Sequence, residues 1–232
     1  MRLVALDTTA RAGSVALAID GTVIEARTGD ASRTHGERLP GEILDLLTAH
    51  GLRAADIDVF AVAAGPGSFT GLRVGIASIQ GLALAHSRRV VAVSALDALA
   101  HIAARDRRSS TSLTGALVDA QRGEIFGALY RGKAEVAAPL VAAPRQAIAE
   151  WKALLAGVDV LAIGDGAARY RDVLEDAVGE RVHFYAPLVP PLAPAIAEMA
   201  YALAASGATI APHAIVPIYI RRPDAEMTRV KN

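Results

Sequence analysis

One strand–turn–strand pattern occurs twice in this chain, and this duplication restricts the possible folds more than any other feature of the sequence. The segment VALDTTARAGSVALAIDG, which starts at residue 4, corresponds to GALVDAQRGEIFGALYRG, which starts at residue 115. Each copy has an aspartate at the end of its first strand, Asp7 or Asp119, and a glycine at its hairpin, Gly21 or Gly132. Two similar α/β lobes are therefore predicted. Chance similarity is the alternative, because hairpins that contain Asp and Gly are common.

Hydrophobic periodicity predicts the order βββαβαβα in the first half of the chain. Strands are expected at 3–7, 14–19, 23–28, 59–64 and 90–93, and helices at about 38–50, 72–82 and 95–105. The pair Asp20-Gly21 suits a two-residue hairpin turn, since glycine tolerates a positive φ. The polar stretch 105–112 is interpreted as a linker.

The second half is expected to repeat this order. Strands are predicted at 113–119, 124–130, 134–141, 160–163 and 182–185, a helix at 144–156, a glycine turn at 164–166 and a last helix that ends near 206–207. The fold class is therefore α/β with two lobes of the βββαβα type, spanning residues 1–106 and 107–232. We expect the last helix and the tail to pack back on the first lobe.

Composition excludes several classes of protein. Hydrophobic residues make up 53% of the chain, which provides enough apolar surface for a globular core. Lys and Arg total 24, as do Asp and Glu, so contact with RNA has to be local or made through a partner. The chain has no cysteine, which excludes disulfides and thiolate metal sites. No apolar run approaches the roughly 20 residues of a membrane helix, so we expect a cytoplasmic protein without membrane contact.

A glycine-rich loop between a predicted strand and a predicted helix is the sharpest local motif. The loop reads GPGSFTGLR, and its candidate phosphate contacts are Gly65, Gly67, Ser68 and Thr70. Free backbone N–H groups at a helix start, with Ser68 or Thr70 as cap, form a possible anion site. The loop lacks the lysine of a Walker motif and the third glycine of a dinucleotide fingerprint. A tight structural turn is the alternative interpretation.

The second candidate motif is Asp7-Thr8-Thr9 at the end of the first strand. In a two-lobed phosphotransferase this position holds a carboxylate that positions metal and water, and hydroxyls that bind phosphate. Such enzymes need glycine after the carboxylate so that the backbone can approach phosphate, but Thr8 and Ala120 stand there. Two carboxylates that cap turns are the alternative, and we assign no catalytic residue.

The six histidines predict no metal site. A helical metal pair needs two imidazoles on one face, four residues apart. His35 is followed four residues later by Leu39, and none of the other histidines has such a partner.

Two predicted helices carry apolar stripes that raise the question of a partner. One stripe consists of Leu39, Ile43, Leu46 and Leu47, and the other of Leu72, Ile76, Ile79 and Leu82. The small residues Gly75, Ala77, Gly81 and Ala83 permit close approach of another helix. Part of this surface has to cover the sheet, and any remainder is a candidate docking surface.

These motifs together resemble the TsaB (YeaZ) family. The resemblance is carried by LVALDTTARAGSVAL, THGERLPGEILDLL, AVAAGPGSFTGLRVGIASIQGLALA, VSALDALA, VDAQRGEIFGALY, IGDGAARY and PIYIRR, in this order. It implies an actin-like ATPase (ASKHA, RNase H-like) fold, a cytoplasmic location and a homodimer in isolation. It also implies a heterodimer with TsaD through the two striped helices, which TsaE joins when ATP is present.

The resemblance further implies a non-catalytic role. The paralogue TsaD holds a metal through paired histidines and modifies the adenosine beside the anticodon in tRNAs that read ANN codons. This chain, with Leu39 in the second ligand's place, would activate TsaD allosterically and contact tRNA only indirectly. ATP or ADP would bind only at the complex interface. The alternative is a small phosphotransferase or ATPase that uses Asp7 and the 65–70 loop, whereas a TsaD-type transferase or a glycoprotease is disfavoured.

Overall fold

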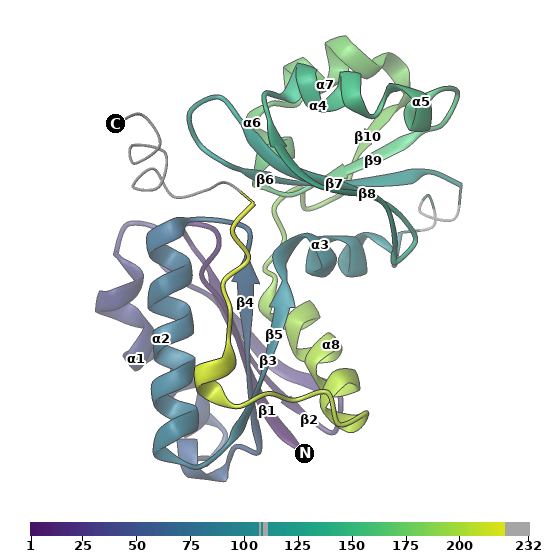
Figure 1. Cartoon of the computed structure of the whole chain (residues 1–232). Helices are drawn as coiled ribbons and strands as arrows, with labels where there is room; N and C mark the ends of the chain where they lie inside the picture. The colour runs from purple at the N-terminus through teal and green to yellow at the C-terminus, as the bar shows by residue number, and fades with distance from the viewer. Residues whose placement is uncertain (107, 109–110, 221–232) are drawn as a thin grey trace, which may run out of the picture. The chain divides into compact units, whose positions relative to one another are not determined.

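The fold is taken from a computed structural model that describes residues 1–106, 108 and 111–220 (Figure 1). The chain forms two compact units. Unit 1 comprises Met1–Ile102 together with Pro190–Pro217, and unit 2 comprises Ala103–Val189 and, at the end of the described chain, residues 218–220. Most of the tail, from residue 221, lies outside the described residues, and so does the expectation that this part packs on the first lobe.

Unit 1 is built on a five-stranded sheet. Its strands are β1 (Arg2–Asp7), β2 (Ser14–Ile19), β3 (Thr22–Thr28), β4 (Val59–Gly65) and β5 (Arg89–Ser94), in the order β3-β2-β1-β4-β5. The first three form an antiparallel meander, and β4 and β5 continue the sheet parallel to β1. The hairpin between β2 and β3 turns at Asp20 and Gly21, both at positive φ, as the sequence predicts.

Helices cover both faces of this sheet. Two long helices, α1 (His35–Ala49) and α2 (Phe69–Ala85), lie side by side on one face, and α8 (Ala193–Ala205) lies on the other (Figure 1). The helix α3 (Ala95–Ala103) follows β5, and a short 3₁₀ turn, η1 (Ala54–Asp56), precedes β4. After α8 the chain pairs Ile210 with Val90 at the β5 edge and forms η4 (Pro212–Ala214) against α2.

Unit 2 repeats the topology of unit 1. Its strands are β6 (Leu113–Asp119), β7 (Ile125–Arg131), β8 (Ala134–Ala142), β9 (Val160–Ile163) and β10 (Val182–Phe184), in the order β10-β9-β6-β7-β8. Again an antiparallel meander is extended by two parallel strands. This equivalence confirms the predicted duplication and excludes chance similarity of two hairpins. The chain has the expected α/β, actin-like fold with two lobes.

The helices of unit 2 differ from the prediction in three places. The predicted helix 144–156 is divided at Trp151 into α4 (Pro144–Glu150) and α5 (Lys152–Leu155). The turn predicted at 164–166 is wrong, because Gly164, at φ 110°, caps α6 (Asp165–Arg169) directly. A further helix, α7 (Arg171–Val178), and the 3₁₀ turn η3 (Gly179–Arg181) were not predicted. The apolar pattern of α7 is too short to stand out in the sequence.

Candidate functional site

The two motifs of unit 1 meet at one edge of the sheet. Since β1 and β4 are parallel neighbours, the loops that follow Asp7 and Gly65 emerge side by side. The Ser68 N–H donates to the Thr9 carbonyl over 2.9 Å. Ser68 is also the N-cap of α2, since its Oγ accepts from the Gly71 N–H at 3.2 Å. Thr70, the other candidate cap, lies exposed in the first turn of the helix.

The Asp7 side chain is turned toward its own loop. Its Oδ1 accepts from the Thr9 N–H at 2.8 Å and from the Thr9 hydroxyl at 2.6 Å. Asp7, Thr8 and Thr9 are all buried. The carboxylate thus has the capping role that the sequence left open as an alternative, and the hydroxyl of Thr9 is committed to it.

Three glycines let this loop lie directly against α2. A Cβ on Gly67 would fall 2.5 Å from the Thr9 Cβ. At Gly71 it would fall 2.2 Å from the Thr8 carbonyl oxygen, and at Gly75 it would fall 2.2 Å from the Thr8 Oγ1. Such separations are far below van der Waals contact, so only glycine fits. The Thr8-Thr9 backbone therefore fills the space beside the start of α2.

Unit 2 has its own carboxylate cluster at the equivalent strand end. The Asp119 carboxylate accepts from the Gln121 N–H at 3.0 Å and from Arg169 Nη1 at 3.1 Å. The Asp119 N–H in turn donates to Asp165 Oδ1 at 2.9 Å. Burial raises the pKa of the Asp165 carboxyl, and the nearby charge of Asp119 adds to this effect. The duplicated aspartates Asp7 and Asp119 thus both organise turns.

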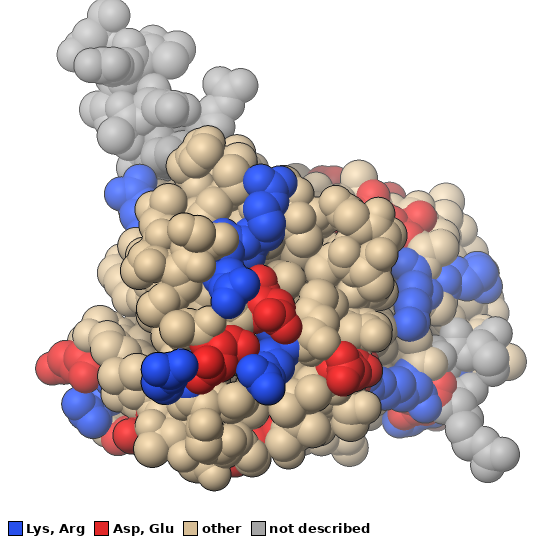
Figure 2. Space-filling model, turned by 90° about the horizontal axis from the view of Figure 1, so that it is seen from below, with Lys and Arg blue, Asp and Glu red and all other residues tan. Residues whose placement is uncertain are grey.

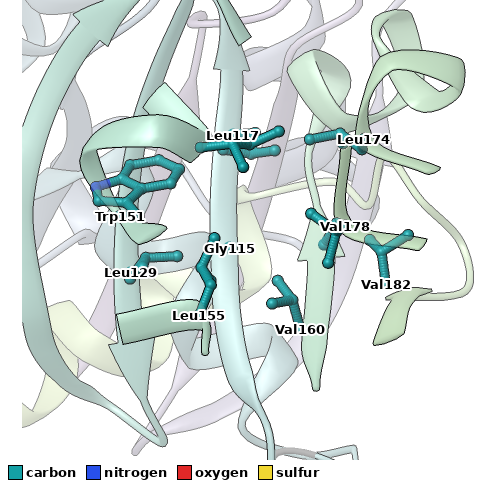
Figure 3. Close-up of a pocket in the computed structure, with 11 residues that line it drawn as sticks. Gly115, Leu117, Leu129, Trp151, Leu155, Val160, Leu174, Val178 and Val182 are labelled. Carbon is teal, nitrogen blue, oxygen red and sulfur yellow. The ribbon is translucent and has the colours of Figure 1, made fainter. Parts of the chain in front are cut away.

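A cavity in unit 2 is purely apolar. It lies between the sheet and the helices, beside Gly115 and Trp151, and has a volume of about 20 Å³ (Figure 3). A single water needs roughly 10–15 Å³ and several polar partners. This space is therefore a small packing gap and is far too small for a nucleotide.

The apolar stripes are mostly core, and the prediction that they form the docking surface is wrong for seven of the eight residues. Leu39, Ile43, Leu46, Leu47, Leu72, Ile76 and Ile79 are all buried in the core of unit 1. Leu82 is partly buried against the same core. The periodicity marks the side of each helix that covers the sheet. The substitution Ile76→Glu would therefore place a carboxylate in the core and destabilise unit 1 instead of testing a docking surface.

The opposite side of the two helices is exposed and carries small and apolar residues beside three charged ones, Glu37, Asp45 and Arg73. We call it the outer face of α1 and α2, and define it by Pro40, Gly41, Leu44, Ala77, Gly81 and Leu84. Leu44 is 55% exposed and Leu84 is 59% exposed, although both are large hydrophobic residues. A Cβ on Gly41 or Gly81 would meet nothing within 4 Å. Gly81 and Ala77 were predicted from the sequence as points of helix approach, whereas Leu44 and Leu84 were not.

Gly75 and Ala83 were also expected to admit a partner helix, and here the expectation is wrong. Both residues are buried, and Gly75 faces Thr8 within the same unit. The close approach that Gly75 permits is therefore internal to the chain.

The half-buried His35 and the buried Arg38 form a polar cluster at the start of α1. The His35 Nε2 lies 3.1 Å from the Ala10 carbonyl oxygen, and its Nδ1 lies 2.8 Å from Arg38 Nη2. Burial lowers the pKa of the His35 imidazole, and the Arg38 charge lowers it further. Both ring nitrogens are engaged, and Leu39 is core. In the described part of the chain, no three His, Cys, Asp or Glu residues are grouped as metal ligands would be.

Surface charge offers no extended basic patch on the face that Figure 2 shows. Basic and acidic side chains alternate there. Opposite charges also pair locally: Arg108 binds Asp106 at 2.7 Å and lowers the pKa of that carboxyl to about 2. Among the described residues, no helix is both long and apolar enough to span a bilayer.

Comparison with known proteins adds the family context. The model of the TsaD family, tRNA N6-adenosine threonylcarbamoyltransferase, matches residues 27–228. The tRNA threonylcarbamoyladenosine biosynthesis protein TsaB of Escherichia coli is 41% identical over 131 residues, which cover 56% of this chain and 55% of that protein. TsaB of Bacillus subtilis is 28% identical over 228 residues, or 97% and 96% of the two chains. The solved structure of YeaZ from Pseudomonas aeruginosa has a TM-score of 0.74 at 29% identity, over 94% and 99% of the two chains.

Proposed function

Because the chain belongs to the TsaD family, and within it to the TsaB (YeaZ) proteins, we propose that it acts in tRNA threonylcarbamoyladenosine biosynthesis as a non-catalytic subunit that docks onto TsaD. In this proposal the outer face of α1 and α2 binds the partner. The active conformation of TsaD binds this face more tightly than the inactive conformation does, so docking shifts TsaD toward the active conformation.

The observation that carries the proposal is the pair of glycines on the outer face. Glycine in the interior of a helix costs about 1 kcal/mol relative to alanine. Gly41 and Gly81 both lie inside helices, and a Cβ on either would meet open space, so packing within the chain gives no reason for them. Close approach by the backbone of a second helix provides that reason. Leu44 and Leu84 beside them supply apolar surface for such a contact.

The packing of the Asp7 loop supports a non-catalytic role. The Ser68 N–H, which would face a phosphate at the start of α2, is bonded to the Thr9 carbonyl. The Thr9 hydroxyl donates a hydrogen bond to the Asp7 carboxylate. A phosphate at this place would have to displace the loop, so the phosphotransferase alternative has no observation in its favour.

The remaining features of the proposal follow the family. TsaD is the direct partner, TsaE joins an ATP-dependent ternary complex, and ATP or ADP is bound only at a joint interface. The isolated chain forms a homodimer, tRNA is reached through TsaD, and the complex acts in the cytoplasm. Turnover of ATP by the isolated chain that disappears in Asp7→Ala would contradict this assignment.

A charge placed on the outer face tests the docking proposal. We expect Leu84→Glu to weaken binding to TsaD from the same organism at least about tenfold, or 1.4 kcal/mol, because it buries an unpaired carboxylate in the interface. Leu84 is exposed in the isolated chain, so the melting temperature should stay within about 2 °C of wild type. Isothermal titration calorimetry and thermal melts measure the two quantities.

The matched control is Leu154→Glu, the same substitution at a leucine of α5 that is 41% exposed. It should leave the affinity for TsaD unchanged. Equal affinity of the wild type and Leu84→Glu would place the docking surface elsewhere, and failure of the wild type to bind would refute the proposed partner.

A further inference from the structure

The Arg38 guanidinium is buried at the start of α1 and joins it to the loop between β1 and β2. Its side chain is only 2% exposed. The Nη2 donates to the carbonyls of Arg11 and Ala12 and approaches His35 Nδ1, while Nη1 binds both carboxylate oxygens of Glu42 at 2.7 and 2.8 Å. A planar fork of donors can hold several acceptors at once in a way that an ammonium cannot.

Two glycines leave room for this cluster. A Cβ on Gly29, which follows β3, would fall 1.4 Å from Arg38 Nη1 and 2.6 Å from the Ala12 carbonyl oxygen. A Cβ on Gly13 would fall 2.9 Å from the His35 ring. The guanidinium therefore lies in a socket formed by two different loops, and α1 closes it.

The first half of α1 needs such support because it is a poor helix by itself. Residues 35–41 read HGERLPG, with two glycines and a proline inside seven positions. Pro40 has no N–H to donate to the carbonyl of Gly36, and each glycine weakens the helix. The capping box of Thr34 and Glu37 holds only the first turn. Of residues 35–41 only Leu39 is part of the apolar core, whereas Ile43, Leu46 and Leu47 anchor the second half there.

We propose that Arg38 is a positioning residue for partner docking: its socket keeps the first half of α1 helical and thereby presents Pro40 and Gly41 of the outer face. This inference rests on the proposed docking of that face. The Arg38 side chain is 2% exposed and lies on the buried side of the helix, so it does not contact the partner. It affects binding only because it keeps this part of α1 helical.

Hydrogen exchange in the isolated chain tests the socket without any partner. In Arg38→Met, the amides of residues 38, 39, 41 and 42 should exchange at least about tenfold faster than in wild type, while those of 43–49 stay within about twofold. Arg53→Met is the matched control, since Arg53 is 80% exposed and its loss should change neither segment. Uniform acceleration over the whole of α1 would show general destabilisation and overturn the inference.

Affinity for TsaD tests the consequence. Arg38→Met should weaken binding at least about fivefold at a temperature where circular dichroism shows the variant fully folded. Gly29→Ala attacks the socket from the other side, leaves α1 unchanged in sequence, and should weaken binding in the same way. Unchanged affinity in both variants would overturn the role of Arg38. If the wild type itself fails to bind, the proposed function fails, whereas the exchange result on the socket stands.

Discussion

The glycines within and just before α1 and α2 differ in their surroundings, and the distances to a hypothetical Cβ divide them into two groups. At Gly67, Gly71 and Gly75 another part of the chain occupies the space, so the residues are required by internal packing. At Gly41 and Gly81 the space is open, and the proposed docking of a partner helix would account for these two residues. From the sequence alone these two groups are indistinguishable, because a glycine in a helix carries no record of which neighbour approaches it.

Two glycines on the sheet of unit 2 give opposite predictions for the same substitution. Gly115 borders the apolar cavity in Figure 3, and a Cβ there would lie 3.4 Å from Val160, an ordinary contact. Gly115→Ala should therefore raise the free energy of unfolding by about 0.5–1 kcal/mol, since it fills space and restricts the unfolded chain. Gly127→Ala should lower it by about 1–3 kcal/mol, because its Cβ would fall 2.7 Å from Trp151.

Urea denaturation of the two variants measures both effects. The comparison is internally controlled, because both residues lie on adjacent strands of one sheet and differ only in the space beside them. If Gly115→Ala were as destabilising as Gly127→Ala, the cavity would not be the packing gap described.

Helices and strands were predicted well where a single sequence pattern was dominant, and poorly where the same residues were typical of both a helix and a turn. The strands of both meanders and the helices α1, α2 and α8 follow from alternation, periodicity and turn residues. The helix α6 was missed because Gly164-Asp165-Gly166 is equally typical of a turn. The apolar stripes were correctly predicted to lie on helices, but they were wrongly predicted to be exposed. Periodicity marks the face that is buried, and in this chain that face covers the sheet.

The same limit applied to the candidate site. Asp7 and the loop that starts at Gly65 were identified from the sequence, and the parallel pairing of β1 with β4 brings them together. Arg38 was missed, although its spacing of four residues from Glu42 was a visible signal of an ion pair. Nothing in the sequence shows that this pair is buried against a loop more than 20 residues away.

The first half of α1 should become less stable as the pH falls. Because the pKa of His35 in the folded chain lies below its ordinary value of 6.5, the unfolded chain binds the proton first. The stabilisation by neutral His35 is thus fully present above about pH 6.5 and is lost as the pH falls toward the folded pKa. Protonated His35 would also face the Arg38 guanidinium, whose hydrogen bond it now accepts.

Hydrogen exchange at pH 7.5 and 5.5, corrected for the intrinsic pH dependence of exchange, measures this effect. Protection of the amides of residues 38, 39, 41 and 42 should fall at the lower pH, and His35→Gln should remove most of the difference. Equal corrected protection at both pH values in the wild type would contradict the assignment of His35 as neutral in the fold.

At the scale of the whole molecule, the duplication of the sheet does not by itself account for the composition of unit 1. Both units share one strand order, yet unit 1 is completed by a segment from far along the sequence. The helix α8 packs on β1 and β2, with five buried residues: Ala193, Ala195, Ile196, Ala197 and Ala200. Without them one face of the sheet would be open to water. The sequence boundary at residue 106 separates the two repeated strand patterns. The core of unit 1, however, includes residues from both sides of this boundary.

This path predicts the behaviour of a fragment cut at that boundary. Removing α8 uncovers the sheet surface that four alanines and an isoleucine of this helix bury, a loss on the order of 5 kcal/mol, which is comparable to the whole stability of a small domain. Residues 1–106 alone should therefore show no cooperative thermal transition. The same fragment fused through a flexible linker to residues 190–217 should regain one, because the helix then covers the sheet. The fusion that carries Ile196→Asp provides the control, since Ile196 is fully buried and a carboxylate there prevents packing. A cooperative transition in 1–106 alone would mean that the hairpin repeat and its two long helices fold without the returning helix.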